Sequence, residues 1–328
     1  MIVSFNVAKP HKKYKQSKIK KTKISYQFKE LYDYIESEYA SELEKNRKNL
    51  LKSIIICIIL FIISFILYIF LDKLLDFNTK NAQKILGIVF IPAVMYFIYK
   101  YKKYNEIYVE NYKDKIIKNF VTYINNNLNY HQYGGKHLFN YYLDAKFDDK
   151  NFNSFVTDDY IEGFNENNTK IEMCNIAIEN VNDNGEFLNL SYEGIFSITK
   201  LNIYLSEELR IKKNSYSLKN NYNKVEMDSK EFEKYFDVYS NSNILAMEIL
   251  THDIMEELVQ FYTTYKIKFE LVIKNDNIYI RFDTGVMFEP NILKKSNDMN
   301  VLWVYYNILV FVTNLTIKIN KLLKNLDI

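Results

Sequence analysis

Glycine, proline and cysteine are scarce in this chain, with 7, 3 and 2 residues among 328. The few glycines form neither a phosphate-binding loop nor a Gly-x-Ser-x-Gly nucleophile elbow, so two common enzyme signatures are absent. The two cysteines lie in unlike surroundings, Cys57 inside an apolar run and Cys174 in a polar region. No disulfide framework is therefore expected, and a reducing compartment fits best.

Acidic residues are missing from the N-terminal segment, where residues 1–29 hold nine lysines and no Asp or Glu. We interpret residues 1–27 as a basic, disordered tail. The charge of such a tail helps to set membrane topology, and its lysines can also contact anionic lipid headgroups. Nucleic acid is another polyanion that lysines bind, and it is the least favoured of these three interpretations.

Charged residues are also missing from Ile54 to Leu71, an uncharged stretch of 18 residues between Lys52 and Asp72. As a helix this stretch is about 27 Å long, close to the ~30 Å hydrocarbon core of a bilayer. Fifteen of its residues are Ile, Leu or Phe, and each of these favours insertion by roughly 0.3–0.6 kcal/mol. The stretch predicts a membrane anchor.

A second apolar stretch, Ile85 to Tyr99, is shorter and contains one glycine and one proline. A partner helix would relieve the polar cost of a proline kink, and flanking lysines can reach toward the headgroups. We therefore expect a transmembrane helical hairpin over residues 52–100, with spans at about 53–71 and 85–100. The mean hydropathy of −0.24 is too low for a larger membrane bundle, which leaves a soluble domain beside the anchor.

Basic residues at the outer ends of this hairpin set the expected orientation. The linker of residues 72–84 also holds lysines, so the charge bias is modest. The positive-inside rule places both termini in the cytoplasm, as in a multi-pass protein of the cell (inner) membrane. The basic residues at the outer ends are Arg47, Lys48 and Lys52 before the hairpin and Lys100, Lys102 and Lys103 after it.

Amphipathic patterns flank the hairpin on both sides. Apolar residues recur at helical spacing from Phe28 to Leu50 and from Ile117 to Leu128, which predicts cytosolic helices over residues 28–51 and 101–130. No glycine or proline interrupts residues 28–81, so the first helix is free to run unbroken from the cytosol into lipid. Packed antiparallel, the two cytosolic arms would form a stalk.

Residues 131–328 carry short strand patterns separated by turn residues and helices. Thr169 to Glu179 and Phe187 to Tyr192 flank an Asn-Asp-Asn-Gly turn, which is a strong hairpin signal. The pattern lacks the βαβ rhythm of a parallel sheet, so we expect a cytosolic α+β domain with a mainly antiparallel sheet. Further strands are expected at residues 193–205, 236–239, 267–273 and 278–282, the last two joined by a turn at Asn275-Asp276-Asn277.

Helices are expected within and at the end of this domain. Asp228 and Glu231 resemble a capping box that opens a helix over residues 229–235, and Thr251 is placed to cap a helix over residues 253–265. The last helix carries an apolar stripe at alternating spacings of four and three, which is a packing seam. Residues 301–317 are uncharged and could form a third span, but we favour a helix buried against sheet or stalk. The stripe comprises Val301, Tyr305, Ile308, Val312, Leu315, Ile319, Leu322 and Leu326.

Candidate metal and catalytic residues match no known spacing. His131 and His137 could be combined with Cys174 and the acidic group of Asp144, Asp148 and Asp149, but solvated loop residues are the better interpretation. The segment from Asn180 to Gly185 superficially resembles the start of a calcium loop, yet Asn180 stands where the first Asp belongs, so a hairpin turn is favoured.

His252 and Asp253 stand beside Glu256 and Glu257 on one expected helix. The group is not a His-Glu-x-x-His motif, and acids in a first helical turn are ordinary partners of the helix dipole. No catalytic, cofactor-binding or metal-binding residue is therefore assigned, and no cofactor is expected.

Several segments, taken in order, carry a family resemblance. The most specific runs from Val225 to Ser240 (Val-Glu-Met-Asp-Ser-Lys-Glu-Phe-Glu-Lys-Tyr-Phe-Asp-Val-Tyr-Ser) and is followed by Ile249-Leu-Thr251 and Phe288-Glu-Pro290. With segments at 28–32, 43–48, 159–163 and 192–202, they resemble an uncharacterised bacterial membrane family catalogued as domain of unknown function 3137. The resemblance spans roughly residues 28–320. It implies a membrane hairpin, a cytosolic α+β domain and a charged, cytosolic last helix, and it supplies no activity or ligand.

The leading functional hypothesis is a membrane-anchored cytosolic interaction or ligand-sensing module. Its expected partners are the lipid bilayer and an unknown protein or ligand. Two alternatives remain open. One is a membrane-bound enzyme of unrecognised type, and the other is a membrane scaffold whose last helix self-associates into a homo-oligomer.

Overall fold

The chain forms two compact units in a computed structural model. The first unit comprises residues up to Lys29, Lys118–Phe288 and Asn300 onward, and the second comprises Glu30–Ile117 and Glu289–Met299. The basic tail predicted at residues 1–27 lies almost wholly outside the described residues. The described residues are 26–74, 79–147, 152–182, 184–213 and 223–325.

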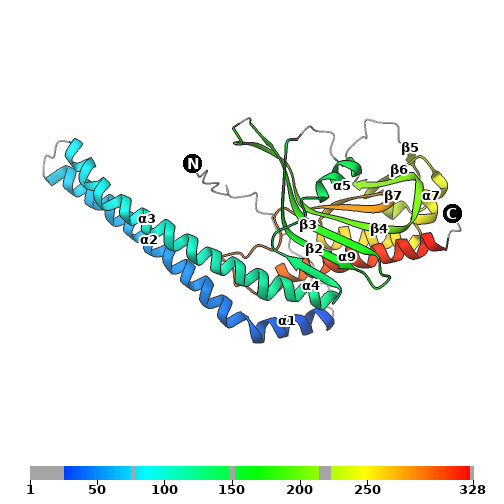
Figure 1. The fold of residues 1–328 in the computed structure, drawn as a ribbon, viewed down its shortest axis with the longest axis horizontal. Coiled ribbons are helices and arrows are strands. Elements are labelled where there is room, and N and C mark those ends of the chain that lie inside the picture. The colour runs from blue at the N-terminus through cyan, green and yellow to red at the C-terminus, as the bar shows by residue number, and fades with distance from the viewer. Residues whose placement is uncertain (1–25, 75–78, 148–151, 183, 214–222, 326–328) are drawn as a thin grey trace. The chain divides into compact units, whose positions relative to one another are not determined.

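Two long helices dominate the second unit. Helix α2 (Ala40–Leu74) and helix α3 (Thr79–Tyr112) lie side by side and antiparallel (Figure 1). Near the ends remote from their connection they bury Leu43 and Leu50 of α2 and Tyr108 and Tyr112 of α3. Leu43 and Leu50 belong to the first apolar stripe that the sequence pattern predicted, whereas the second predicted stripe, from Ile117 to Leu128, begins beyond the end of α3.

The first predicted helix is not continuous. Helix α1 (Tyr26–Glu38) ends at a turn at Tyr39, and α2 begins at Ala40, although no glycine or proline is present to break the helix. The amide of Tyr39 still donates to the carbonyl of Ile35 at 3.0 Å, and the amide of Leu43 donates to the carbonyl of Tyr39 at 3.1 Å. Ile35 and Leu43 are both fully buried, so each helix keeps its own apolar side in the core across the turn.

The second predicted arm also ends earlier than its apolar spacing suggested. A short π-helix η1 (Lys113–Ile117) and helix α4 (Lys118–Ile124) follow α3, and Leu128 then enters a strand. Within the second unit, the Nζ atom of Lys115 lies 2.5 Å from a carboxylate oxygen of Glu42 on α2. Leu128 fits the helical spacing of the arm, but it pairs with Gly163 of β2 and therefore lies in a strand.

A seven-stranded antiparallel sheet forms the centre of the first unit. The strand order is β1-β2-β3-β4-β6-β5, and β7 pairs with β4 off this path. This confirms the predicted α+β class with a mainly antiparallel sheet and packed helices. The strands are β1 (Leu128–His131), β2 (Ser154–Phe164), β3 (Lys170–Val181), β4 (Phe187–Lys213), β5 (Asn223–Val225), β6 (Phe236–Ser240) and β7 (Lys268–Asp283).

The turn between β3 and β4 is the predicted Asn-Gly turn. The side-chain oxygen of Asn182 accepts hydrogen bonds from the amides of Asn184 at 3.1 Å and Glu186 at 2.8 Å. Gly185 adopts a φ of +76°, a conformation that glycine reaches without steric cost. The segment that superficially resembled a calcium loop is therefore a hairpin turn, with Asp183 outside the described residues.

The hairpin predicted around Asn275 does not form. Both halves of the predicted hairpin belong to one strand that pairs along β4, from Phe282 opposite Ile195 to Leu271 opposite Ile211. Asn275 takes a φ of +54° at a register shift in this pairing. Asn tolerates the left-handed conformation, so the residue that signalled a turn here makes a β-bulge.

Gly194 allows β4 and β7 to approach closely. A Cβ atom at this position would lie 2.0 Å from the carbonyl oxygen of Phe282 on β7. No real Cβ atom tolerates that distance, and the obstacle is backbone rather than a flexible side chain. The glycine in the Tyr192-Glu-Gly segment therefore has a packing role.

Helices cover the sheet, and the N-caps of two of these helices differ from the predicted ones. Ser229 caps its helix by accepting a hydrogen bond from the amide of Phe232 at 3.3 Å, so the cap is not the predicted pair of Asp228 and Glu231. Thr251 occupies the cap position of α8 but makes no side-chain cap bond. The helices of this unit beyond α4 are α5 (Leu138–Ala145), α6 (Lys230–Glu233), α7 (Asn243–Ile249), α8 (His252–Tyr265) and α9 (Met299–Lys324).

Helix α9 covers one face of the sheet, opposite α5 (Figure 1). Its Phe311 ring stacks on Phe261 of α8 with the ring centroids 4.0 Å apart, and it also contacts Phe269 and Phe282 of β7. At the start of the helix, Trp303 meets Phe28 with a centroid distance of 4.8 Å. Most of the predicted stripe is buried, at Tyr305, Ile308, Val312, Leu315 and Ile319.

One helix in the described part of the chain is long and apolar enough to cross a membrane, at Met299–Asn325. Of its most apolar window, 56% is buried inside the protein, and the core helix of a soluble domain meets the same criteria. The finding is therefore weak support for a span. The spans predicted at 53–71 and 85–100 stay predictions, because many side chains there lie outside the described set.

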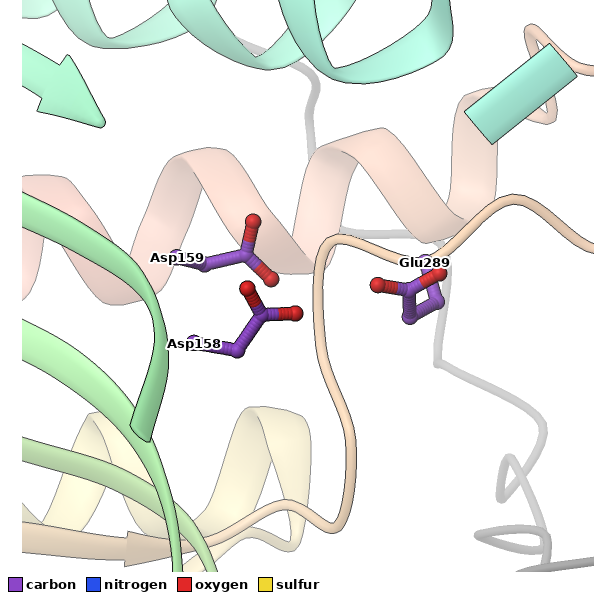
Figure 2. A group of neighbouring side chains, drawn as sticks. All are labelled: Asp158, Asp159 and Glu289. Atoms are coloured by element: carbon purple, nitrogen blue, oxygen red, sulfur yellow. The ribbon is translucent and has the colours of Figure 1, made fainter. Parts of the chain in front are cut away.

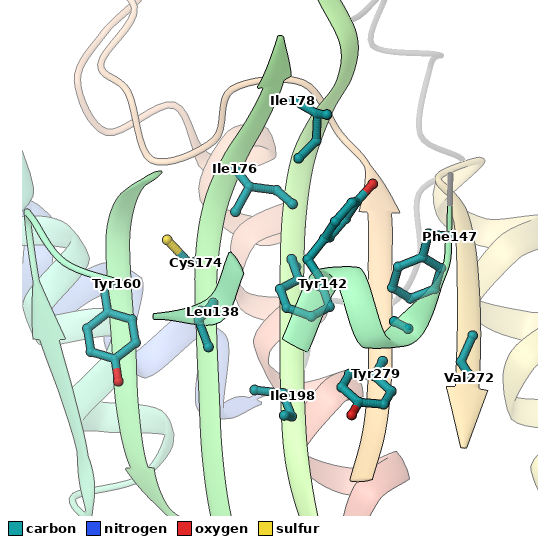
Figure 3. Packing of buried hydrophobic residues seen from close by; sticks show 12 residues of the cluster. Leu138, Tyr142, Phe147, Tyr160, Cys174, Ile176, Ile178, Ile198, Val272 and Tyr279 are labelled. Carbon is teal, nitrogen blue, oxygen red and sulfur yellow. The ribbon is translucent and has the colours of Figure 1, made fainter. Parts of the chain in front are cut away.

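The other face of the sheet carries an aromatic core beneath α5 (Figure 3). Tyr142 of α5 packs against Phe196 of β4, and Phe196 stacks on Tyr279 of β7. Arg281 lies among these rings with its side chain only 14% exposed, and its guanidinium is 4.9 Å from the Phe147 ring and 3.1 Å from a carboxylate oxygen of Glu270. This largely buried charge is thus paired, as burial requires.

Asp144 ties α5 to β7. Its carboxylate accepts hydrogen bonds from Lys274 at 2.6 Å and from the Tyr279 hydroxyl at 2.8 Å. Burial acts to raise the pKa of Asp144, but the bonds from Lys274 and Tyr279 more than offset it, and the net pKa lies below its ordinary value. A lowered pKa means that the carboxylate contributes stability above the unfolded-state pKa of about 3.9 and loses it as the pH falls.

We therefore expect the Asp144→Asn variant to have a lower Tm than the unsubstituted protein at pH 7, because the charge-assisted bonds are lost. The difference should shrink as the pH falls through 4 toward 3, where Asp144 itself becomes protonated. Thermal unfolding between pH 7 and 3 measures this. The exposed Glu166→Gln is the matched control, and a Tm difference for D144N that is constant across the pH range would contradict the prediction.

Candidate functional site

Strands β1, β2 and β3, with the turn that leads into α5, bring two glutamates and two histidines together on the α5 face of the sheet. In the strand register, His131 of β1 stands opposite Tyr160 of β2, and Glu162 of β2 stands opposite Glu172 of β3. Like charges directly opposite each other on neighbouring strands are destabilising. The two carboxylates therefore need positive charge or protons around them.

The hydroxyl of Tyr160 lies between these two carboxylates. Its oxygen is 2.5 Å from Oε1 of Glu172 and 2.9 Å from Oε2 of Glu162. A phenol has one proton to donate, so it satisfies only one of two ionised acceptors at a time. Burial and the two acceptors raise the pKa of Tyr160, which keeps the phenol protonated.

Imidazole and ammonium groups surround the pair of glutamates. Nε2 of His137 lies 2.5 Å from Oε1 of Glu172, and Nζ of Lys170 lies 3.0 Å from its Oε2 atom. Nε2 of His131 lies 3.4 Å from Oε1 of Glu162. Burial acts to raise the pKa of Glu172, but the donors Tyr160, His137 and Lys170 lower it further than burial raises it.

A glycine pair positions His137 at the start of α5. Gly135 has a φ of +78°, and a Cβ atom there would lie 2.8 Å from the sulfur of Cys174. Only glycine fits this tight passage. The chain can then turn from β1 into α5 and bring the His137 ring edge-on to Tyr160, with the centroids 5.5 Å apart.

The cluster is half open to solvent. The side chains of His131 and His137 are 48% and 51% exposed, whereas that of Glu172 is 7% exposed. The site therefore has a fixed carboxylate at its base and two accessible imidazoles at its rim. Such an arrangement can hold a proton or a cation. We name His131, His137, Tyr160, Glu162, Lys170 and Glu172 the His–Glu cluster.

The structure separates the other residues that the sequence had grouped with these histidines. Cys174 is buried with its sulfur 3.2 Å from the carbonyl oxygen of Asp158, and burial raises the pKa of the thiol. Asp144 pairs with Lys274. Asp148 and Asp149 lie outside the described residues, and His131 belongs to a strand rather than to a loop.

Two acidic residues of the first unit, Asp158 and Asp159, lie at the bulge of β2 (Figure 2). Asp159 has a φ of +54° at a register shift, and its buried carboxylate accepts hydrogen bonds from Tyr130 and, at 3.0 Å, from Asn175. Glu289, drawn in the same figure, belongs to the second unit, where it pairs with Lys113 at 2.5 Å. Tyr130 and Asn175 both belong to the first unit.

The second group considered from the sequence does not converge on a site. His252, Asp253 and Glu256 are exposed on α8, and a carboxylate oxygen of Glu257 accepts a hydrogen bond from Lys318 of α9. These acids therefore lie at the surface in the first turns of α8, as the helix dipole favours.

Residues 190–321 match the sequence model of the family described as "Protein of unknown function (DUF3137)". The match confirms the family resemblance and covers the chain from β4 into α9. Among solved structures, the crystal structure of the mycobacterial trehalose monomycolate transport factor A, TtfA, is similar over 56% of this chain and 88% of that chain, with 7% identity and a TM-score of 0.32. No curated protein matches the chain.

Removing the hydroxyl of Tyr160 should destabilise the first unit. In Tyr160→Phe the buried Glu172 loses a donor and faces Glu162 without an intervening proton, so we expect a loss of about 1–3 kcal/mol and a lower Tm. Tyr204→Phe is the control, because Tyr204 is 67% exposed. Equal Tm values for Y160F and Y204F would show that the shared hydroxyl contributes nothing.

Proposed function

We propose that the chain is a membrane-anchored module that presents its α+β domain to the cytosol for interaction with a protein or a ligand. The observation that carries the proposal is the apolar surface of α2. In the described part of this helix, Ile55 is 53% exposed, Ile62 is 50% exposed and Ile66 is 60% exposed. A contiguous apolar surface of this extent marks contact with a membrane or with another protein.

The length and composition of this surface favour a bilayer. Consecutive apolar residues around the helix are exposed, and a protein partner would cover only one side of it. At 1.5 Å per residue the uncharged stretch reaches about 27 Å, which matches the hydrocarbon core. The exposed side chains are Ile55, Ile56, Ile58, Ile59, Leu60, Phe61, Ile62, Ile63, Phe65, Ile66, Ile69 and Phe70.

Helix α3 supplies the second half of the proposed transmembrane hairpin. Among its described side chains, Met95, Tyr96, Ile98 and Tyr99 are exposed, and Nζ of Lys100 lies 5.6 Å from the Tyr96 ring centroid. Tyrosine and lysine together are typical of the interface between hydrocarbon and headgroups. This supports the proposed boundary near Lys100, where the sequence pattern also predicts it.

The alternatives draw less support from the described residues. Self-association through the stripe of α9 would need a free surface, but Ile308, Val312 and Leu315 are buried in the chain's own core. A membrane-bound enzyme would need a nucleophile or a catalytic acid and base, and no known catalytic motif occurs in the sequence. An interaction or sensing role is the function that we infer.

Charges in α2 should abolish membrane anchoring. Each Lys at a helix centre costs roughly 2.5–3.5 kcal/mol of insertion free energy. The insertion cost of the triple variant Ile58→Lys, Ile62→Lys, Ile66→Lys should therefore exceed the favourable insertion free energy of the other apolar residues. We expect the unsubstituted protein to remain in the membrane pellet after alkaline carbonate extraction and the triple variant to leave it. The control is Tyr204→Lys, Ile244→Lys, Met247→Lys, at exposed positions outside the hairpin.

If the triple variant pellets like the unsubstituted protein after detergent-free extraction, α2 is not the anchor. Release of the control variant as well would show that added charge acts through misfolding. Both results would contradict the proposal.

Reporter fusions should show a hairpin rather than a single pass. A green fluorescent protein fused after Ile328 is expected to fluoresce in the cytoplasm, and an alkaline phosphatase fused at the same position should be inactive. An alkaline phosphatase inserted between Leu74 and Thr79 should be active, because the connection would lie outside. An active phosphatase after Ile328 would overturn the hairpin or require a third span.

A further inference from the structure

We propose that the His–Glu cluster is a proton-controlled latch, in which protonation of His137 fastens the start of α5 to strands β2 and β3. His137 stands directly before α5, and its contacts with Glu172 and Tyr160 join this turn to the two strands. The inference uses only residues of the first unit. It can therefore fail while the proposed membrane anchor holds, and the anchor can fail while the latch holds.

The groups that contact Glu172, apart from His137, keep their charge between about pH 5 and 8. Burial and its two carboxylate acceptors raise the pKa of Tyr160, so the phenol stays neutral. The hydrogen bond to Glu172 raises the pKa of Lys170, so the ammonium stays charged. Glu172 itself stays ionised, because its donors hold its pKa below the ordinary value despite burial. Imidazole is the side chain that changes its charge in this interval, so a change of pH acts on the cluster through its histidines.

One proton balances the formal charges of the cluster. With neutral imidazoles, the two glutamates contribute two negative charges and Lys170 contributes one positive charge. The geometry favours His137 as the place for this proton. Its Nε2 atom lies 2.5 Å from Oε1 of Glu172, whereas Nε2 of His131 lies 3.4 Å from Oε1 of Glu162. The Glu172 side chain is 7% exposed and that of Glu162 is 39% exposed, so water screens the pair of His137 and Glu172 less.

Protonation of His137 strengthens its bond to Glu172. A neutral imidazole carries either a proton or a lone pair on Nε2, and an ionised carboxylate can accept only the proton. Imidazolium donates from both nitrogens, and charge-assisted hydrogen bonds are roughly twice as strong as neutral ones. A proton that the folded chain binds more tightly than the unfolded chain stabilises the fold as the pH falls. The latch therefore closes at lower pH and loosens as the pH rises.

Other charged and titratable groups near His137 set the strength of this response. Lys170 opposes a positive charge on His137, and the two carboxylates favour it. The titratable groups in the elements packed around His137 are His131 on β1, Tyr160 and Glu162 on β2, Lys170, Glu172 and Cys174 on β3, Lys136 in the turn and Tyr141 on α5.

The far end of α5 is held by contacts that involve no histidine. The guanidinium of Arg210 donates to the carbonyl oxygens of Ala145 at 2.8 Å and Lys146 at 3.0 Å, and Asp144 pairs with Lys274. An arginine stays charged at every pH of this interval. A change of pH therefore acts on the turn at Gly135 to His137 and on the first turn of α5, while the end of the helix stays in place.

Hydrogen–deuterium exchange of the intact, detergent-solubilised protein tests the latch. Between pH 8 and pH 5.5, after correction for the intrinsic pH dependence of exchange, the amides of residues 135–139 should become about three- to tenfold better protected, as a half-exposed charge-assisted bond allows. His137→Gln keeps a neutral donor and should lose this gain, and Glu172→Gln removes the charge of the acceptor and should lose it too. His252→Gln is the matched control, because His252 is an exposed histidine outside the cluster, and it should keep the gain.

Thermal unfolding distinguishes the latch from a packing role of His137. At pH 8 the Tm of H137Q should lie close to that of the unsubstituted protein, because both side chains can offer a neutral N–H to Glu172. At pH 5.5 the Tm of H137Q should be lower by about 2–4 °C. A Tm difference of the same size at both pH values would show that His137 only packs, and would overturn the proposal. Equal gains of protection in H137Q and the unsubstituted protein, or no gain in the unsubstituted protein, would overturn it as well.

Discussion

The first unit depends on strand β4, which is paired along both of its edges. One edge of β4 pairs first with β3 and then with β6, and the other edge pairs with β7 from Ile195 to Ile211. The two aromatic cores lie on opposite faces of this central ladder, with α5 over one face and α9 over the other (Figure 1). The close approach at Gly194 is therefore a requirement of the whole unit, because a displaced β7 would remove Phe282 from one core and Tyr279 from the other.

Local chemistry made part of this fold predictable from the sequence. The turn at Asn182 to Gly185 and the buried stripe of α9 follow from short-range rules, namely a glycine with positive φ and apolar residues repeating at helical spacing. The same local rules gave wrong predictions where pairing with a residue distant in the sequence determines the local structure. Asn275 carries turn chemistry yet makes a bulge, because β4 is long enough to pair with residues on both sides of it. Leu128 continues a helical stripe yet joins β2.

The residues that meet in the His–Glu cluster could likewise not be predicted from the sequence alone. The sequence shows His131 and His137 as metal-binding residue types, but no spacing in it groups Glu162 and Glu172 with them. Their meeting depends on the bulge between Asp158 and Ile161, since a shift of one residue in a strand turns every following side chain to the opposite face. Sequence spacing alone contains no such information, because His137 reaches Glu172 through a turn at two glycines and across 35 residues of chain.

Because Phe28 packs against Trp303, the first unit can complete its fold only after Trp303 has been synthesised. Phe28 also meets Phe120 and Tyr306, so the first unit is assembled from segments on both sides of α2 and α3. At a synthesis rate of roughly 5–20 residues per second, Phe28 waits about 14–55 s for Trp303 to be made. The residues of the long helices are therefore synthesised well before the sheet unit that follows them can complete its fold. Early synthesis exposes their apolar surface first and completes the sheet unit last.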